Sequence, residues 1–129
     1  MSHSPSKSKR HTKAERAADK LGITSARRHI FICCDLKETG CASRKRMTAS
    51  WEYLKKRLKE LKLTKAGGVY RTKSQCFDIC GAGPIAVVWP DGIWYGHCNP
   101  DVLERIIQEH LIAGRVVDEY VIARSPGRE

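Results

Sequence analysis

Long hydrophobic segments are missing from this sequence of 129 residues. No apolar run approaches the ~20 residues that a membrane-spanning helix needs. The first twenty residues are polar and basic, and they lack the apolar core of a secretory signal. We therefore expect a soluble protein in the cytoplasm, and the length fits one compact domain.

The CxxC spacing is also absent, although cysteine is abundant. Disulfides rarely persist in a reducing compartment, so this many cysteines point to a metal or redox centre. Thioredoxin-type oxidoreductases use CxxC at a helix N-terminus, and structural zinc sites with four cysteine ligands usually contain two CxxC-like pairs. The sequence therefore favours neither a thiol oxidoreductase nor a structural zinc site. The six cysteines are Cys33, Cys34, Cys41, Cys76, Cys80 and Cys98.

Acidic residues are scarce in two basic segments that produce most of the net charge of +10. Residues 1–28 hold eight Lys and Arg against two acidic residues, and residues 44–73 hold eleven against two. The rest of the chain, with all six cysteines, is slightly acidic. Such basic segments suit solvation, an acidic protein partner or nucleic acid. The nucleic-acid hypothesis lacks the interleaved aromatic residues of RNA-binding sheets and the spacing of zinc fingers.

The N-terminal segment has little that it can bury. We expect residues 1–27 to be a basic, largely disordered extension, in which Thr12–Leu21 forms a short helix with Thr12 and Glu15 as a capping box. The folded domain is predicted to span residues 28–123, followed by a C-terminal tail at residues 124–129.

The order of predicted elements indicates an α/β fold with a small sheet and helices packed on it. Apolar residues recur at helical spacing between residues 48 and 63. Pro90-Asp91-Gly92 is typical of a hairpin turn in which glycine adopts a positive φ. Asn99-Pro100 is typical of a helix start, and Gly114 of a helix end. We expect strands at residues 28–33, 69–72, 85–89, 93–95 and 116–122, and helices at 48–63 and 99–113.

Two pairs of cysteines have spacings that suit a shared metal. Cys76 and Cys80 are four residues apart, so on a helical turn both sulfurs would project from one face. Gly81 and Gly83 follow, and residues without a Cβ let backbone N–H groups approach a thiolate, which raises a cluster's reduction potential.

The second pair spans a loop after the first predicted strand and consists of Cys33 or Cys34 together with Cys41. An iron–sulfur cluster accepts four thiolates at such irregular spacing. Cys98 fits the other interpretation of a cysteine, that of a small buried hydrophobe. A zinc-bound structural or nucleic-acid-binding module that uses the basic tail and helix is the alternative function.

The residues also resemble a known family over almost the whole predicted domain. The matching segments are HIFIC at 29–33, WEYLKKRLKEL at 51–61, GGVYRTKSQCFDICGAGPIAVVWPDGIWYGHC at 67–98 and NPDVLERIIQEHLIAGRVVDEYVI at 99–122. This combined pattern is similar to the thioredoxin-like 2Fe–2S ferredoxins of the Shethna type, particularly their cyanobacterial-like members. The same module is similar to the small iron–sulfur subunit of respiratory NADH dehydrogenases.

The resemblance implies a thioredoxin-like fold with a small mixed sheet, and one 2Fe–2S cluster per chain. It implies Cys33, Cys41, Cys76 and Cys80 as ligands of the iron. Cys34 stands beside the first of them and could replace it, and we prefer Cys33 because it closes the HIFIC strand.

The resemblance also implies what the protein does. It predicts a one-electron carrier with no enzymatic activity, which passes electrons between redox protein partners without membrane contact. The family implies a homodimer. The hairpin that carries Trp89, Trp94 and Tyr95 is the candidate interface.

Overall fold

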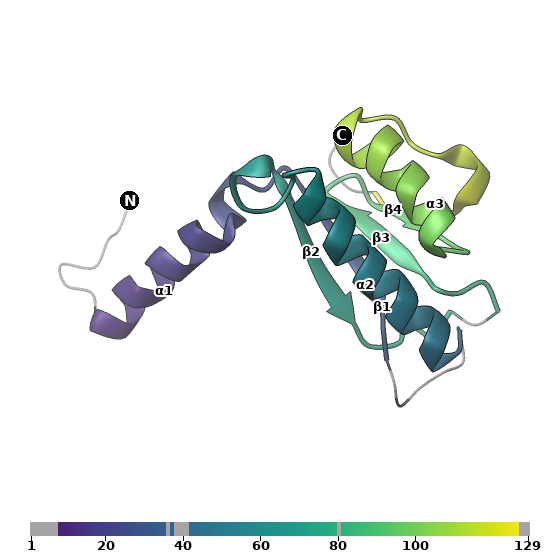
Figure 1. The fold of residues 1–129 in the computed structure, drawn as a ribbon, viewed down its shortest axis with the longest axis horizontal. Helices are drawn as coiled ribbons and strands as arrows, with labels where there is room; N and C mark the ends of the chain where they lie inside the picture. Colours follow the sequence, from purple (N-terminus) through teal and green to yellow (C-terminus); the bar gives the residue numbers. More distant parts are fainter. Residues whose placement is uncertain (1–7, 36, 38–41, 80, 127–129) are drawn as a thin grey trace.

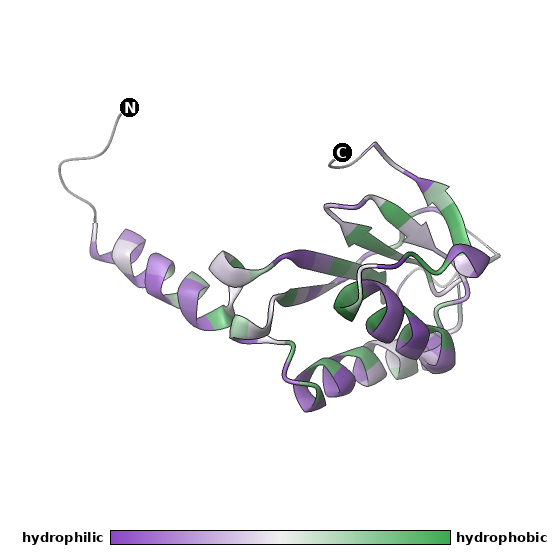
Figure 2. Cartoon of the chain, turned by 90° about the horizontal axis from the view of Figure 1, so that it is seen from above, coloured by the Kyte–Doolittle hydropathy of each residue, from purple (hydrophilic) through white to green (hydrophobic). Residues whose placement is uncertain are grey.

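The computed structural model describes residues 8–35, 37, 42–79 and 81–126. Its centre is a five-stranded mixed sheet with the order β2-β1-β3-β4-β5. Figures 1 and 2 show the helices α2 and α3 on one face of this sheet, while α1 extends away from it. The strands are β1 (Arg28–Cys33), β2 (Val69–Ser74), β3 (Ala86–Trp89), β4 (Ile93–Tyr95) and β5 (Val121–Arg124).

Three α-helices and several short helical turns complete the fold. In the described part of the chain, no helix is long and apolar enough to cross a membrane. Helix α3 continues directly into the π-helical stretch η3. The helices are α1 (Lys9–Leu21), α2 (Arg44–Glu60), α3 (Pro100–Arg105) and η3 (Ile106–Ile112), and the 3-10 turns are η1 (Ile23–Ser25), η2 (Lys65–Gly67) and η4 (Asp118–Tyr120).

The register of β1 with its neighbours places two of the predicted ligands, Cys33 and Cys76, at one end of the sheet. Strand β1 is parallel to β2, with Cys33 opposite Ser74, and antiparallel to β3, with Ile32 opposite Ala86. Because parallel strands end at the same edge of a sheet, the chain leaves β1 and β2 side by side. Cys76 therefore follows β2 at the edge where Cys33 ends β1.

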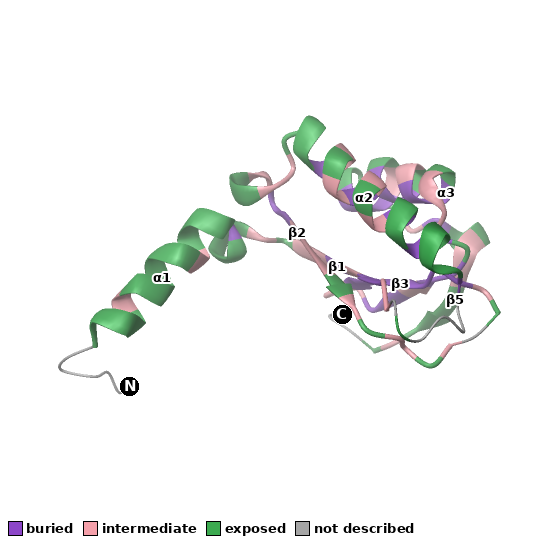
Figure 3. Cartoon of the chain, turned by 60° about the horizontal axis from the view of Figure 1, so that its bottom comes forward, coloured by how far each residue is buried: buried purple, intermediate pink, exposed green. Residues whose placement is uncertain are grey.

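The main core lies between the sheet and the two helices that cover it (Figure 3). Leu54 and Leu58 of α2 are fully buried in the same cluster as Ile30 and Ile32 of β1, which confirms the predicted apolar stripe. The predicted inner face of the second helix is also confirmed. Its buried residues are Val102, Leu103, Ile106, Ile107 and Leu111.

Two helix starts differ from the predictions because serine hydroxyls cap the helices earlier in the chain. Helix α1 begins at Lys9, where Ser8 Oγ accepts a 3.1 Å hydrogen bond from the His11 N–H, so Thr12 is not the cap. Helix α2 begins at Arg44 instead of Thr48, since Ser43 caps it. A serine that precedes a polar turn gives a weaker sequence signal than the apolar stripe that follows it.

The last strand also differs from its prediction. We expected it to begin at Val116, but β5 begins at Val121, after the turn η4. Val117 is buried outside any strand, and its N–H is satisfied by the hydroxyl of Tyr95 instead of a neighbouring strand. The predicted turn between β3 and β4 is confirmed, with Gly92 at a φ of 71°.

Candidate metal centre

Cys33 is the last residue of β1, and its side chain is completely buried. The backbone N–H of Ile85, which precedes β3, donates to Cys33 Sγ over 3.1 Å. In return, the carbonyl oxygen of Ile85 accepts a 2.9 Å bond from the Cys33 N–H. The sulfur is therefore held by the sheet itself, and its donor favours a negatively charged thiolate.

Cys76 lies in the segment after β2 and is half-buried. The N–H of Asp78 donates to Cys76 Sγ over 3.3 Å, with Asp78 in a left-handed conformation at a φ of 61°. The Cys76 N–H donates over 3.1 Å to a carboxylate oxygen of Asp35. We expected a turn or a single helical turn for this segment, and its described residues are not helical.

An apolar cluster separate from the main core surrounds Cys33. Ala42, Met47 and Ile85 are buried together with it. Phe77 and Trp94 pack edge to face, with 5.3 Å between their ring centroids, and join the loop of Cys76 to β4. The half-buried members of the cluster are Cys34, Phe77, Ile79, Ala82 and Trp94. A wall of this kind lowers the local dielectric and limits the access of water to a bound group.

The segment after residue 80 is anchored from two sides. Arg46 of α2 donates over 2.9 Å to the Gly83 carbonyl oxygen and over 3.2 Å to the side-chain oxygen of Asn99. The predicted helix start is confirmed, since Asn99 is the N-cap of α3 and Pro100 its first residue, but the Asn99 side chain bonds to Arg46 and not to the helix backbone. From the other side, the Cys98 N–H donates over 2.9 Å to the Pro84 carbonyl oxygen.

Of the four predicted ligands, the structure places two. Cys33 and Cys76 lie at the same edge of the sheet, while Cys41 and Cys80 lie outside the described residues. Within the described ranges, no group of three or more His, Cys, Asp and Glu side chains is placed to hold a metal ion. Both described sulfurs accept a hydrogen bond from a backbone N–H, and that of Cys33 also lies in the apolar cluster, which are features that suit thiolate ligands.

The two remaining cysteines differ in their surroundings. Cys34 is half-buried beside the apolar cluster, and its N–H pairs with the Ser74 carbonyl oxygen. Cys98 is fully buried in the main core, where its thiol donates to the carbonyl oxygens of Tyr95 and Gly96, each over 3.7 Å. Burial, reinforced by the nearby Cys33, raises the pKa of the Cys98 thiol, so this cysteine stays protonated.

Sequence reasoning missed three contributors to this site. Ile85 and Asp78 act through their backbone N–H groups, which leave no mark in the residue type, whereas the glycines had been expected to supply such donors. In the sequence, Arg46 is one residue of a basic run. Its position three residues after the capping Ser43 is the one signal that could have placed it near a helix start.

Comparison with known proteins gives consistent matches. No protein-family profile matches the chain. The chain is 35% identical over 104 residues to a 2Fe–2S ferredoxin of Clostridium pasteurianum, which covers 78% of this chain and 100% of that protein. It is 29% identical over 102 residues to a 2Fe–2S ferredoxin of Aquifex aeolicus (strain VF5), which covers 75% of this chain and 90% of that protein.

The solved structure of a thioredoxin-like 2Fe–2S ferredoxin from Aquifex aeolicus resembles this fold with a TM-score of 0.66 and 25% identity. The match covers 81% of this chain and 98% of that one. Sequence similarity along the full length of the Clostridium protein thus agrees with similarity of the fold. On this evidence the chain belongs to the family of thioredoxin-like 2Fe–2S ferredoxins.

Proposed function

We propose that this chain is a ferredoxin that carries one electron on a 2Fe–2S cluster bound by the thiolates of Cys33, Cys41, Cys76 and Cys80. The observation that carries this proposal is the hydrogen bond from the Ile85 N–H to Cys33 Sγ inside an apolar cluster. Membership of the family supports the type of cluster. Cys41 and Cys80 enter through the resemblance of their motifs, because they lie outside the described residues.

A 2Fe–2S cluster on four thiolates takes up and releases one electron, between net charges of about −2 and −3. The N–H groups of Ile85 and Asp78 stabilise negative charge on the two sulfurs, and this favours the reduced state. The Asp35 carboxylate has the opposite effect, since it adds negative charge beside Cys76. We infer an electron carrier and no enzyme, because this role needs no acid–base or nucleophilic group.

The side of the centre that faces solvent is the loop of Cys76. Cys33 is fully buried, whereas Cys76 is half-buried, and Asp78 and Gly81 of the same loop are exposed. A Cβ at Gly81 would meet no atom within 4 Å, so the chain leaves open space there. We place the route of the electron to a docked redox protein at this loop.

The redox partner that we propose is acidic, and the proposed location is the cytoplasm. The basic segments 1–28 and 44–73 would attract such a partner electrostatically. Salt screens this attraction beyond about 10 Å at an ionic strength of 0.1 M. We expect electron transfer with an acidic donor protein to slow as ionic strength rises. A rate independent of salt would contradict the acidic partner.

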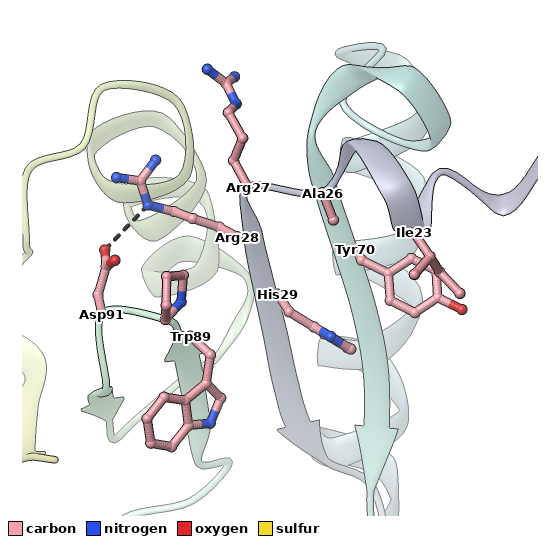
Figure 4. Close-up of a pocket in the computed structure, with 9 residues that line it drawn as sticks. Ile23, Ala26, Arg27, Arg28, His29, Tyr70, Trp89 and Asp91 are labelled. Atoms are coloured by element: carbon pink, nitrogen blue, oxygen red, sulfur yellow. Dashed lines mark hydrogen bonds and ion pairs between the residues drawn. The ribbon is translucent and has the colours of Figure 1, made fainter. Parts of the chain in front are cut away.

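We also propose a homodimer that forms through the sheet face that carries no helix (Figure 2). A cavity of about 770 Å³ on this face is bordered by His29, Tyr70 and Trp89, and the Arg28–Asp91 ion pair of 3.2 Å closes its rim (Figure 4). The structure removes one residue from the predicted contacts of the hairpin interface. Tyr95 is fully buried on the helix side, where it bonds to His110, so Trp89 and Trp94 remain as its candidate contacts.

The dimer is tested by the molar mass in solution. Light scattering coupled to gel filtration should give twice the chain mass for the native protein and once that mass for Trp89→Glu, which places a charge in the proposed interface. Ile112→Glu is the control, because Ile112 is 47% exposed on the helix side and should leave the dimer intact. A native protein of single-chain mass would overturn this part of the proposal.

The cluster is tested on protein purified without oxygen. We expect a red-brown protein with about two iron and two sulfide ions per chain, and an EPR signal after reduction. A colourless protein with one zinc ion per chain would overturn the proposal in favour of the zinc-bound alternative. Cys33→Ser and Cys34→Ser, compared side by side, identify the first ligand. Loss of the visible spectrum in the Cys34 variant alone would assign that role to Cys34.

A further inference from the structure

A second cavity, of about 660 Å³, lies between the C-terminal half of α2, the turn η2 and the start of β2. Leu21 at the end of α1 closes one side of it. This wall is fixed by close packing, because a Cβ at Gly22 would overlap the backbone of Lys65. The volume is in the range of sites for small molecules.

The charged side chains that line this cavity are nearly all basic. Five cations meet a single carboxylate, that of Glu52, which lies 3.2 Å from the ammonium nitrogen of Lys55. The other four cations form no ion pair with any residue in the described part of the chain. They are Lys56, Lys59, Lys65 and Arg71. Positive charges that share one cavity repel each other, so a bound anion would lower their energy.

Arg71 supplies a second, independent observation. Its Nε is buried and has no hydrogen-bond acceptor, and it is the one side-chain atom of this kind among the described residues. The guanidinium lies 5.6 Å from the centroid of the Trp51 ring, a cation–π contact that holds it beside the cavity. Buried N–H groups are almost always paired, so this guanidinium lacks part of its usual hydrogen bonding, and an anion in the cavity would offset its positive charge.

We propose that this cavity binds a small anion with two or more linked phosphate groups. Arginine offers a planar set of donors to phosphate oxygens, and lysines act as compact, rotatable point charges around them. The excess of cations over the one carboxylate matches an anion of several charges better than a single carboxylate ligand. Tyr70 and Val69 add an aromatic and apolar wall that could receive a nucleoside attached to the phosphates.

The site is separate from the proposed redox centre. Strand β2 begins beside the cavity at Val69 and ends at Ser74, two residues before Cys76. At ~3.3 Å per residue, the cavity and Cys76 lie toward opposite ends of the strand. A ligand in the cavity therefore has no contact with the sulfur of Cys33 or Cys76, and we expect it to leave the visible spectrum unchanged.

Binding is tested by calorimetry on the full-length, cluster-containing protein in phosphate-free buffer of low ionic strength. The probes are pyrophosphate and ATP, and each should bind once per chain. Arg71→Gln and Lys59→Gln should each weaken binding at least tenfold. Lys45→Gln removes the same charge from an exposed position outside the cavity and should change the affinity less than twofold.

The outcomes distinguish a nucleoside polyphosphate from an inorganic oligophosphate, and both from a surface that binds nucleic acid. Tighter binding of ATP would identify a nucleoside polyphosphate, and equal binding of both probes would identify an inorganic oligophosphate. No saturable binding, or equal weakening by all three variants, would overturn the proposal. A third result would also overturn the proposal, namely that a DNA 12-mer binds while neither phosphate probe does, and that this binding depends on Lys13 of α1. That result would indicate a nucleic-acid surface. Because Lys59 is exposed, its variant should fold even if Arg71→Gln does not.

Discussion

Ile85 and Cys33 are joined by two hydrogen bonds, one from the Ile85 N–H to the Cys33 sulfur over 3.1 Å and one from the Cys33 N–H to the Ile85 carbonyl oxygen over 2.9 Å. The first proposed ligand is thus positioned by strand pairing at the edge of the sheet. Cys76, in contrast, is positioned by a loop whose contacts come from Asp35 and Asp78. The two halves of the site are therefore held differently, one by a strand and one by a loop, and we expect substitutions in the loop to change the redox properties more readily than the fold.

Asp35→Asn should raise the reduction potential of the protein. The amide oxygen can still accept the hydrogen bond from the Cys76 N–H, while the negative charge that opposes reduction is lost. We expect an increase of roughly tens of millivolts. A redox titration followed by the visible spectrum measures it. Asp19→Asn, on the remote helix α1, removes the same charge and should leave the potential unchanged. Equal potentials for Asp35→Asn and the native protein would contradict the assigned role.

Arg46→Ala should shorten the lifetime of the cluster. Arg46 connects α2 to the Gly83 carbonyl oxygen and to Asn99, so its loss frees the segment that follows the second cysteine pair. We expect the free energy of unfolding to fall by about 1–2 kcal/mol. The decay of visible absorbance in the presence of an iron chelator should become several times faster. Arg44→Ala, two residues earlier on the same exposed turn, serves as the control. The same decay rate in both variants would count against this role.

Glu104→Gln should destabilise the contact between α2 and α3. Both carboxylate oxygens accept from Arg57, over 2.8 and 2.9 Å, and this pairing lowers the pKa of Glu104 to about 2. At neutral pH we expect a loss of about 1 kcal/mol in the free energy of unfolding, since the group is partly exposed. Glu60→Gln removes the other carboxylate beside Arg57. Because the Glu60 side chain is 47% exposed, this variant should lower the free energy of unfolding by less.

The pH dependence of this contribution follows from the direction of the shift. Glu104 binds a proton less readily in the folded chain than in the unfolded chain, whose glutamate pKa is about 4.3. Its stabilising effect is therefore complete above the unfolded pKa and disappears as the pH falls toward 2. Urea unfolding of the native protein and Glu104→Gln should differ by a constant amount from pH 6 to 8. The difference should narrow below pH 4.3, and a difference that grows there would refute the assignment.

Tyr95→Phe should destabilise the fold without affecting the cluster. The hydroxyl lies 2.8 Å from His110 Nδ1 and accepts a 3.0 Å bond from the Val117 N–H, and its removal leaves both buried groups unpaired. We expect a loss of about 1–3 kcal/mol in the free energy of unfolding, measured in urea. Tyr120→Phe is the matched control, because Tyr120 is half-buried near the surface and should change stability by less than ~0.5 kcal/mol. A visible spectrum altered by Tyr95→Phe would argue against separate roles for the core and the metal centre.

Much of the architecture followed from local patterns. The spacing of Leu54 and Leu58 predicted the buried face of α2, and the Pro90–Gly92 turn predicted the pairing of β3 with β4. These predictions succeeded because helix periodicity and turn chemistry depend on residues close together in the chain. The cysteine motifs also consist of residues close together in the chain, and their resemblance to known ferredoxins therefore indicated the family.

The sequence by itself thus determined the class of fold and the family, and it supplied the four cysteines that we propose as ligands. Tertiary structure decided which groups surround each sulfur, since the Ile85 N–H that faces Cys33 is 52 residues away along the chain and every residue except proline carries such a group. It also decided that Tyr95 is a core residue and that lysines of α2 share a cavity with Arg71 of β2. Long-range packing brings these groups together, and no local pattern of residues encodes it.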